Sequence, residues 1–230
     1  MSAAQRLIND TAQTKASPRR ITWNDDPKFQ RWIRFLFDRD DPKGQWRFDD
    51  SPMMLLTDAQ TVHYTHRLCA TAETELAPYS ELQIAHGLHF VFDSNCIYAY
   101  ALRDGEVEIE LKLKAIGAMA TLFRDCLNAR CTPGSKLDQV CFHFWDETPL
   151  SWCERNPHKE KIYAAVADVM RQCLNLSNVC CVESALHGLG HLRSYYPEAA
   201  GIVRHFLNTT QRTDPNLLRY AEAAERGMVQ

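Results

Sequence analysis

The sequence predicts an all-α protein, either an irregular antiparallel helical bundle or an α-solenoid of short helix pairs. Three observations carry this prediction. Apolar residues recur every three or four positions along most of the chain, and capping residues precede many of these stretches. The connections between the stretches are short, so that consecutive helices are expected to pack antiparallel.

Composition and charge restrict the class of protein. With 230 residues, 45% hydrophobic and 24% charged, the chain can bury a sizeable core. The formal net charge of −3 creates no basic field, so we expect no nucleic-acid partner. Neither a membrane span nor a secretory signal is visible, which predicts no membrane partner and a cytoplasmic location. Nine cysteines without a CxxC motif predict reduced, buried thiols.

The domain prediction is simple. We expect residues 1–20 to form a flexible N-terminal arm and residues 21–230 to form a single all-α domain. A charged loop is predicted from Asp38 to Asp50, with Trp46 packed beneath it. The acidic residues of this loop either keep it solvated or meet a basic partner, and we favour solvation.

Start and stop signals divide the domain into helices. The expected helices cover residues 26–37, 57–76, 81–92, 106–129, 137–145, 159–176, 180–196, 198–207 and 215–227, with a further apolar segment at 96–102. Their expected caps are Asp25 or Asp26, Thr57 or Asp58, Ser80, Ser177 or Asn178, and Thr213 or Asp214.

The segment 106–129 is ambiguous at its start. VEIELKL alternates apolar and charged residues as a strand does, but the apolar period of a helix continues into KAIGAMATLFRDCL without a turn signal. We therefore predict a helix. Its expected inward stripe is Val107, Leu111, Lys114 or Ala115, Ala118, Leu122 and Cys126.

The stretch CCVESALHGLGHLRSYY, residues 180–196, is expected to be the central helix. Gly188 and Gly190 each cost about 1 kcal/mol relative to alanine inside a helix, so both need a reason. One reason is the close approach of another helix across the small residues Ser184 and Gly188. The other is a ligand that approaches the helix backbone.

This helix also carries the candidate metal ligands His187 and His191. Two histidines four residues apart lie on one face and can chelate zinc. Glu183 shares that face, but it is about 12 Å from His191 along the axis, which is too far for one ion. HGLGH also lacks the glutamate that serves as general base in zinc proteases. A third ligand would come from another helix, with these candidates: His63, His66, His86 and His89.

The preferred interpretation of His187 and His191 is structural: they form hydrogen bonds with carbonyls or carboxylates inside a helix interface. No catalytic residue is predicted. Phosphate-binding loops, dinucleotide fingerprints and GxSxG are absent from the sequence. Cysteines near histidines, such as Cys141 near His143 or Cys181 near His187, are expected to be buried rather than nucleophilic. The aromatic run at 141–152 either lines a partner groove or forms core.

Two resemblances follow from these motifs. ESALHGLGHL resembles the inner helix of a HEAT repeat, locally over residues 159–207, and His-Gly-Leu occurs at both 86–88 and 187–189. The C-terminal half is also similar to a group of bacterial proteins without an assigned activity. They share a cysteine before ESALHGLGH, a Tyr-Ala helix (Tyr220 here) and a terminal GxVQ. This resemblance implies a bacterial, cytosolic, all-helical protein and adds no chemistry.

The sequence favours a non-enzymatic, HEAT-like interaction module that binds a protein partner of unknown identity and needs no cofactor. The alternative is a metal- or small-ligand-binding protein, with zinc held by the helix of His187 and His191.

Overall fold

The computed structural model describes residues 26–48 and 54–230, and every regular element in these ranges is a helix. The all-α prediction is confirmed. Residues 1–25, which contain the expected N-terminal arm, and the loop residues Asp49 and Asp50 lie outside the described ranges.

The helices follow one another with short connections, and some are interrupted by 3-10 or π turns. The α-helices are α1 (Pro27–Phe37), α2 (Asp58–Ala70), α3 (Ala72–Glu75), α4 (Glu81–Phe92), α5 (Ile97–Arg103), α6 (Ile109–Leu122), α7 (Asn128–Arg130), α8 (Lys136–Phe142), α9 (Phe144–Glu147), α10 (Lys159–Cys173), α11 (Val179–Leu192), α12 (Ala199–Thr209) and α13 (Pro215–Arg226). The other turns are η3 (Gln45–Phe48), η4 (Phe123–Leu127, a π turn) and η5 (Pro149–Ser151).

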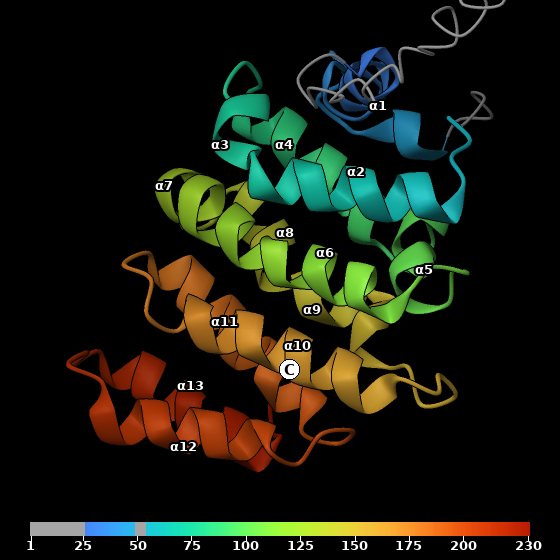
Figure 1. The fold of residues 1–230 in the computed structure, drawn as a ribbon. Helices are drawn as coiled ribbons and strands as arrows, with labels where there is room; N and C mark the ends of the chain where they lie inside the picture. Colours follow the sequence, from blue (N-terminus) through green and yellow to red (C-terminus); the bar gives the residue numbers. More distant parts are fainter. Residues whose placement is uncertain (1–25, 49–53) are drawn as a thin grey trace, which may run out of the picture.

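The helices stack in two layers in the order of the chain (Figure 1). One layer holds α2, α6 and α10, continued by α12, and the other holds α1, α4, α8, α9, α11 and α13. Asp58 at the start of α2 accepts a hydrogen bond from the backbone of Glu106, and Glu110 pairs with Lys161 at the start of α10. Helices of one layer therefore begin side by side, whereas consecutive helices such as α12 and α13 pack antiparallel.

The predicted capping residues begin the helices. Each accepts a hydrogen bond from a backbone N–H of the first turn, which would otherwise lack a partner. These caps are Asp26 on α1, Thr57 on α2, Ser80 on α4, Asn178 on α11 and Asp214 on α13. Gly227 ends α13 with a φ of 71°, as its position in the sequence predicts.

Several predicted helices are shorter than expected. The helix expected over 57–76 breaks at Thr71, whose hydroxyl donates to the carbonyl of Arg67 and competes with the helical pattern. The aromatic helix expected over 137–145 breaks at His143, where the backbone ψ is 4° and redirects the chain into α9. The helix predicted from residue 159 ends at Cys173, before Leu176.

The long helix after residue 106 is confirmed as a helix, but its predicted inward face is partly wrong. It begins at Ile109 because the preceding turn is anchored to Asp58 of α2. Its buried stripe runs through Ile109, Lys112, Ile116 and Met119, since this face meets both α2 and α10. Leu111 is 54% exposed instead of inward.

The predictions of buried thiols and of a packed Trp46 agree with the structure. All nine cysteines are free and buried, and Trp46 lies beneath the charged loop against Phe35 and Phe90. Among the described helices, none combines the length and apolar character that crossing a membrane would require.

Candidate functional site

The two glycines of α11 are positions of close approach. A Cβ on Gly188 would lie 2.6 Å from the Cβ and Cγ of Trp145 in α9, and a Cβ on Gly190 would lie 2.6 Å from Val229. Neighbouring chain segments therefore pack directly on the helix backbone at both positions. Gly87 of α4, in the other His-Gly-Leu sequence, has the same role, because its Cβ would lie 2.3 Å from Phe37.

The Gly188 contact brings α9 next to His187. This imidazole is 1% exposed, and its two nitrogens face different partners. Nδ1 lies 2.6 Å from the hydroxyl of Tyr220 on α13, and Nε2 lies 3.2 Å from Oδ2 of Asp146 on α9. The ring of Phe142 packs against the imidazole at a centroid distance of 4.3 Å. His187 therefore lies inside a helix interface, next to a carboxylate and a hydroxyl.

Asp146 also meets a second histidine. Nδ1 of His143, in the turn between α8 and α9, lies 3.2 Å from the same oxygen, Oδ2. Burial raises the pKa of the Asp146 carboxyl, but the hydrogen bonds with His187 and His143 outweigh it and leave the pKa below its ordinary value. The carboxylate is therefore ionised at neutral pH between two imidazoles.

His191 lies beside this cluster without joining it. Its ring is 4.6 Å from that of His187, and it is exposed to solvent. Burial and the neighbouring His187 lower its pKa. The predicted site joined His187 and His191 with a third ligand from another helix, whereas the group of possible ligands in the described residues is His143, Asp146 and His187. The candidates His63, His66, His86 and His89 are not part of the His187 cluster in the described residues.

His143 and Asp146 are site residues that the sequence patterns did not predict. The signal was the spacing of three between them, which places both on one face of a helical turn. They were assigned to the aromatic run at 141–152, and their neighbour Trp145 is indeed core. Tyr220, part of the Tyr-Ala motif near the C-terminus, adds a hydroxyl group next to Nδ1 of His187.

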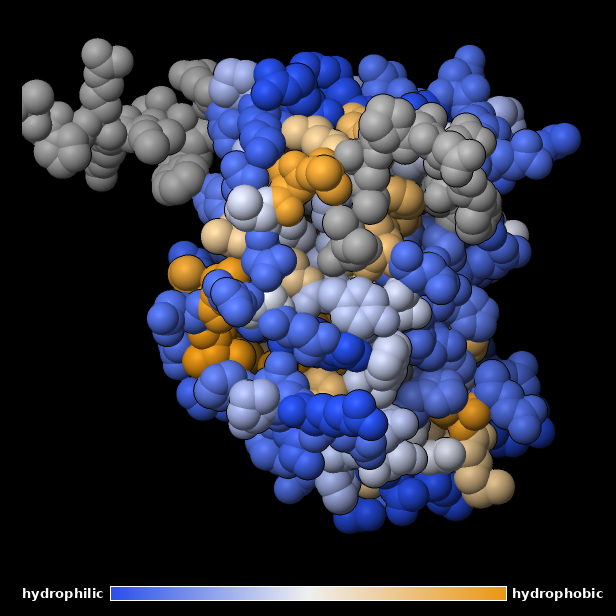
Figure 2. Space-filling model, turned by 90° about the vertical axis from the view of Figure 1, so that its right-hand side faces the viewer, coloured by the Kyte–Doolittle hydropathy of each residue, from blue (hydrophilic) through white to orange (hydrophobic). Residues whose placement is uncertain are grey.

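A second candidate site is an apolar groove of about 500 Å³ between α2 and α6. Orange side chains gather at the left edge of Figure 2, on the side of the layer that holds these helices. The groove is lined by Ala59, Val62, His63, His66, Arg67, Ala70, Thr71, Val107, Leu111 and Lys114.

The charged side chains that line this groove are all positive. Lys114 and Arg67 are the charged residues of its lining, and Asp and Glu are absent from it. Arg67 pairs with Glu75 at 3.4 Å and lies over the ring of Phe29, so Lys114 is the exposed cation. The pKa values of the His63 and His66 imidazoles are lowered. Burial is the larger cause, and the neighbouring cations add to it.

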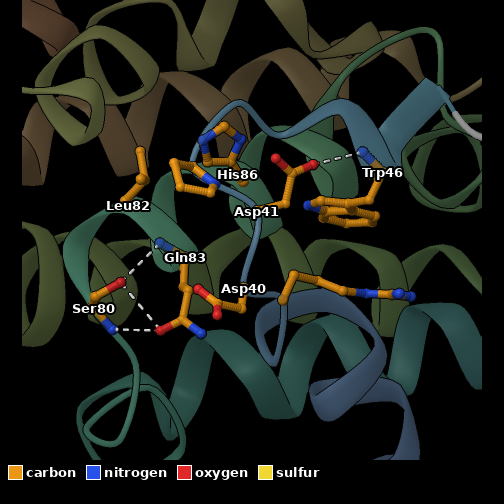
Figure 3. A pocket seen from close by; sticks show the side chains of 9 residues that line it. Asp40, Asp41, Trp46, Ser80, Leu82, Gln83 and His86 are labelled. Atoms are coloured by element: carbon orange, nitrogen blue, oxygen red, sulfur yellow. Dashed lines mark hydrogen bonds between the residues drawn. The ribbon is translucent and has the colours of Figure 1, made fainter.

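A third hollow, of about 150 Å³, lies beneath the acidic loop (Figure 3). Asp41 accepts hydrogen bonds from the backbone of Trp46 and Lys43 and so closes the loop on itself. On the opposite wall, Ser80 and Gln83 form the capping box of α4. The Asp41 contacts hold the loop in its conformation, which agrees with a structural role for this part of the acidic run.

Cys141 and Cys181, the thiols near histidines, are buried, and hydrogen bonds with Cys131 and Cys141 lower the pKa of Cys181 to about 5. The Sγ of Cys141 faces the carbonyl of Cys180 at 3.9 Å. Hydrogen bonding with the thiols of Cys131 and Cys181, together with burial, raises the pKa of Cys141 well above its ordinary value. This thiol is neutral at physiological pH and inert as a nucleophile.

Comparison with protein-family models, curated proteins and solved structures finds no match for this chain. The resemblances to a bacterial family and to HEAT repeats therefore stay predictions, while the all-helical fold stands.

Proposed function

We propose that the protein is a HEAT-like helical interaction module that binds an acidic amphipathic helix of a partner protein in the α2–α6 groove. The observation that carries the proposal is Leu111, which is 54% exposed beside a groove whose lining is apolar and cationic. One exposed leucine is ordinary, but Leu111 lines a concave site together with Ala59, Val62, Ala70 and Val107, and a contiguous apolar concave site favours a binding surface.

The shape of the groove fits a helix. Its α2 wall uses positions 59, 62, 63, 66, 67, 70 and 71, a continuous stripe on one face of the helix. Its other side is formed by Leu111 and Lys114 of α6 and by Val107 in the turn before that helix. A stripe of this extent is about 18 Å long, which corresponds to roughly three turns of a partner helix. Such a partner would insert apolar residues at i, i+3 or i+4, and i+7.

The charge of the groove selects the partner. A helix with Glu or Asp beside its apolar stripe would place them near Lys114, and a basic helix would be repelled. The HEAT-like part of the proposal rests on two features: the alternation of helices between two layers, and the matching positions of Gly87 and Gly188 within one of those layers.

The test uses a designed amphipathic peptide of about three helical turns, with leucines on one face and glutamates beside them. We expect it to bind the isotope-labelled protein and to shift amide resonances of α2 and α6. Leu111→Ser is expected to weaken binding about tenfold, because truncated anchor residues cost more than 1 kcal/mol. Met228→Ser is the matched control, since Met228 is 69% exposed and lies outside the groove.

Binding that is unchanged in Leu111→Ser, or resonance shifts confined to other helices, would overturn the proposal. A second copy of the chain is the competing occupant. If the protein alone sediments as a dimer and Leu111→Ser converts it to a monomer, the groove is a self-association surface and the acidic-helix proposal is wrong.

A further inference from the structure

His143, Asp146 and His187 place three ligand atoms together at the junction of α8, α9 and α11. These atoms, one from each residue, all lie within 4.8 Å of one another. Oδ2 of Asp146 is 3.2 Å from a nitrogen of each histidine. Imidazole nitrogens and a carboxylate oxygen are ordinary ligands of zinc and of other divalent transition metals.

The two separations that involve Asp146 fit one ion, whereas the two imidazole nitrogens are within 4.8 Å of each other and would move closer together around it. Zinc binds imidazole nitrogen at about 2.0–2.1 Å and carboxylate oxygen at about 2.0–2.2 Å, so neighbouring ligands of a tetrahedral ion are about 3.3–3.5 Å apart. Both distances of 3.2 Å are close to this value. An ion could therefore be held with small adjustments of the three side chains.

The neighbours of His187 fix the orientation of its imidazole ring, as is usual for histidines that bind a metal ion. A ligating histidine generally places its second ring nitrogen on a hydrogen-bond partner, and here Nδ1 faces the Tyr220 hydroxyl at 2.6 Å. Phe142 packs on the ring and limits its rotation. The missing side chain at Gly188 lets α9 approach closely enough for Asp146 to reach the imidazole.

One further feature points to a cation. Oδ1 of Asp146 is buried without a hydrogen-bond partner among the described residues. A buried carboxylate oxygen without a partner is costly, and a bound ion offsets that cost.

We propose that His143, Asp146 and His187 bind one divalent transition-metal ion of the zinc type, with the remaining position open to water or a small ligand. The side chain of His143 is 48% exposed and that of Asp146 is 30% exposed, whereas His187 is buried. The ion therefore enters from solvent and contacts it on the side of His143. Three protein ligands with an open position are the arrangement of catalytic rather than structural zinc sites.

The test is calorimetric titration of Zn²⁺ into untagged protein stripped with a chelator. The expected result is one equivalent bound per chain. His143→Gln and Asp146→Asn are expected to lower affinity by at least tenfold, and Tyr220→Phe, which leaves all three ligands in place, by about tenfold. His205→Gln is the matched control, because His205 is an exposed histidine on α12.

His143 is the informative position, because it is exposed and its replacement leaves the core intact. Circular dichroism and thermal unfolding of each variant separate lost binding from lost folding. Less than half an equivalent of Zn²⁺ on the folded wild type, or a His143→Gln variant that binds as tightly as the wild type, would overturn the proposal. Neither outcome affects the groove between α2 and α6, which is tested with the peptide.

Discussion

Replacing Gly188 with alanine tests whether α9 packs directly against the backbone of α11. Alanine normally stabilises a helix interior by about 1 kcal/mol relative to glycine. At Gly188 the new Cβ would lie 2.6 Å from the Cβ and Cγ of Trp145 and 2.8 Å from Sδ of Met170. The methionine can move, but the Trp145 atoms are fixed to the backbone of α9, so the helices must separate.

Overpacking of this kind costs about 1–3 kcal/mol, with more in rigid surroundings. Because the Trp145 atoms cannot move aside alone, we take the upper part of this range, about 2–3 kcal/mol. After the gain of about 1 kcal/mol in helix propensity is subtracted, we expect Gly188→Ala to destabilise the protein by about 1–2 kcal/mol. For a chain of this size that corresponds to a fall in Tm of about 2–8 °C. Urea and thermal unfolding, followed by circular dichroism, measure both quantities.

Gly117 provides the matched control. It lies in the middle of α6, is exposed, and has nothing within 4 Å of the position where a Cβ would stand. Gly117→Ala is therefore expected to stabilise the protein by about 0.4–1 kcal/mol. If Gly188→Ala stabilises it to the same extent, the close approach of α9 to α11 is wrong, and the positioning of Asp146 against His187 loses its explanation.

Three more predictions follow from individual contacts. Asp26→Ala should cost about 1–2 kcal/mol at neutral pH because α1 loses its cap. The pKa of Asp26 is below its ordinary value of 3.8: burial raises it, but hydrogen bonds from Tyr64 and the helix N–H groups outweigh burial. The difference between Asp26→Ala and wild type in urea unfolding should therefore be present above pH 4 and shrink as the pH falls through the lowered pKa. Leu111→Ser should change the free energy of unfolding by less than about 0.5 kcal/mol because Leu111 is exposed. Ile116→Ala should lower it by about 2–5 kcal/mol because Ile116 is buried, and denaturant titration measures both values. Because the pKa values of His63 and His66 are lowered from 6.5, both side chains are neutral at pH 7. Their protonation as the pH falls below 6.5 should tighten binding of the acidic peptide, which fluorescence anisotropy measures.

Local signals in the sequence explain most of the fold. Thr57, Ser80 and Asp214 begin helices because their side chains satisfy N–H groups only a few residues away, and such interactions can be read from the sequence alone. Leu111 shows the limit of periodicity. Its exposure depends on where α6 begins and on which helices pack against α6. The start of α6 is set by Asp58, about fifty positions earlier, which accepts a hydrogen bond from the turn before the helix.

The metal cluster could be predicted only in part. The spacing of His187 and His191 on one helix predicted a candidate site. The unfavourable helix propensity of Gly188 indicated that another chain segment approaches the helix there. The partner in that approach, α9, could not be identified, because the pairing depends on the packing of Trp145 against a helix about forty residues later. The break at His143, which turns its ring toward Asp146, likewise had no signal in helix propensity.

The most direct test of the proposed function is a charge swap at Lys114. The glutamate-bearing peptide and a version with lysines in the same positions are titrated into wild type and Lys114→Glu. Since a charge reversal at an exposed site changes binding by roughly 0.5–1.5 kcal/mol, we expect a change of about three- to tenfold. The predicted result is that wild type prefers the acidic peptide and Lys114→Glu prefers the basic one. A preference that is the same in both proteins would contradict binding of an acidic helix in this groove.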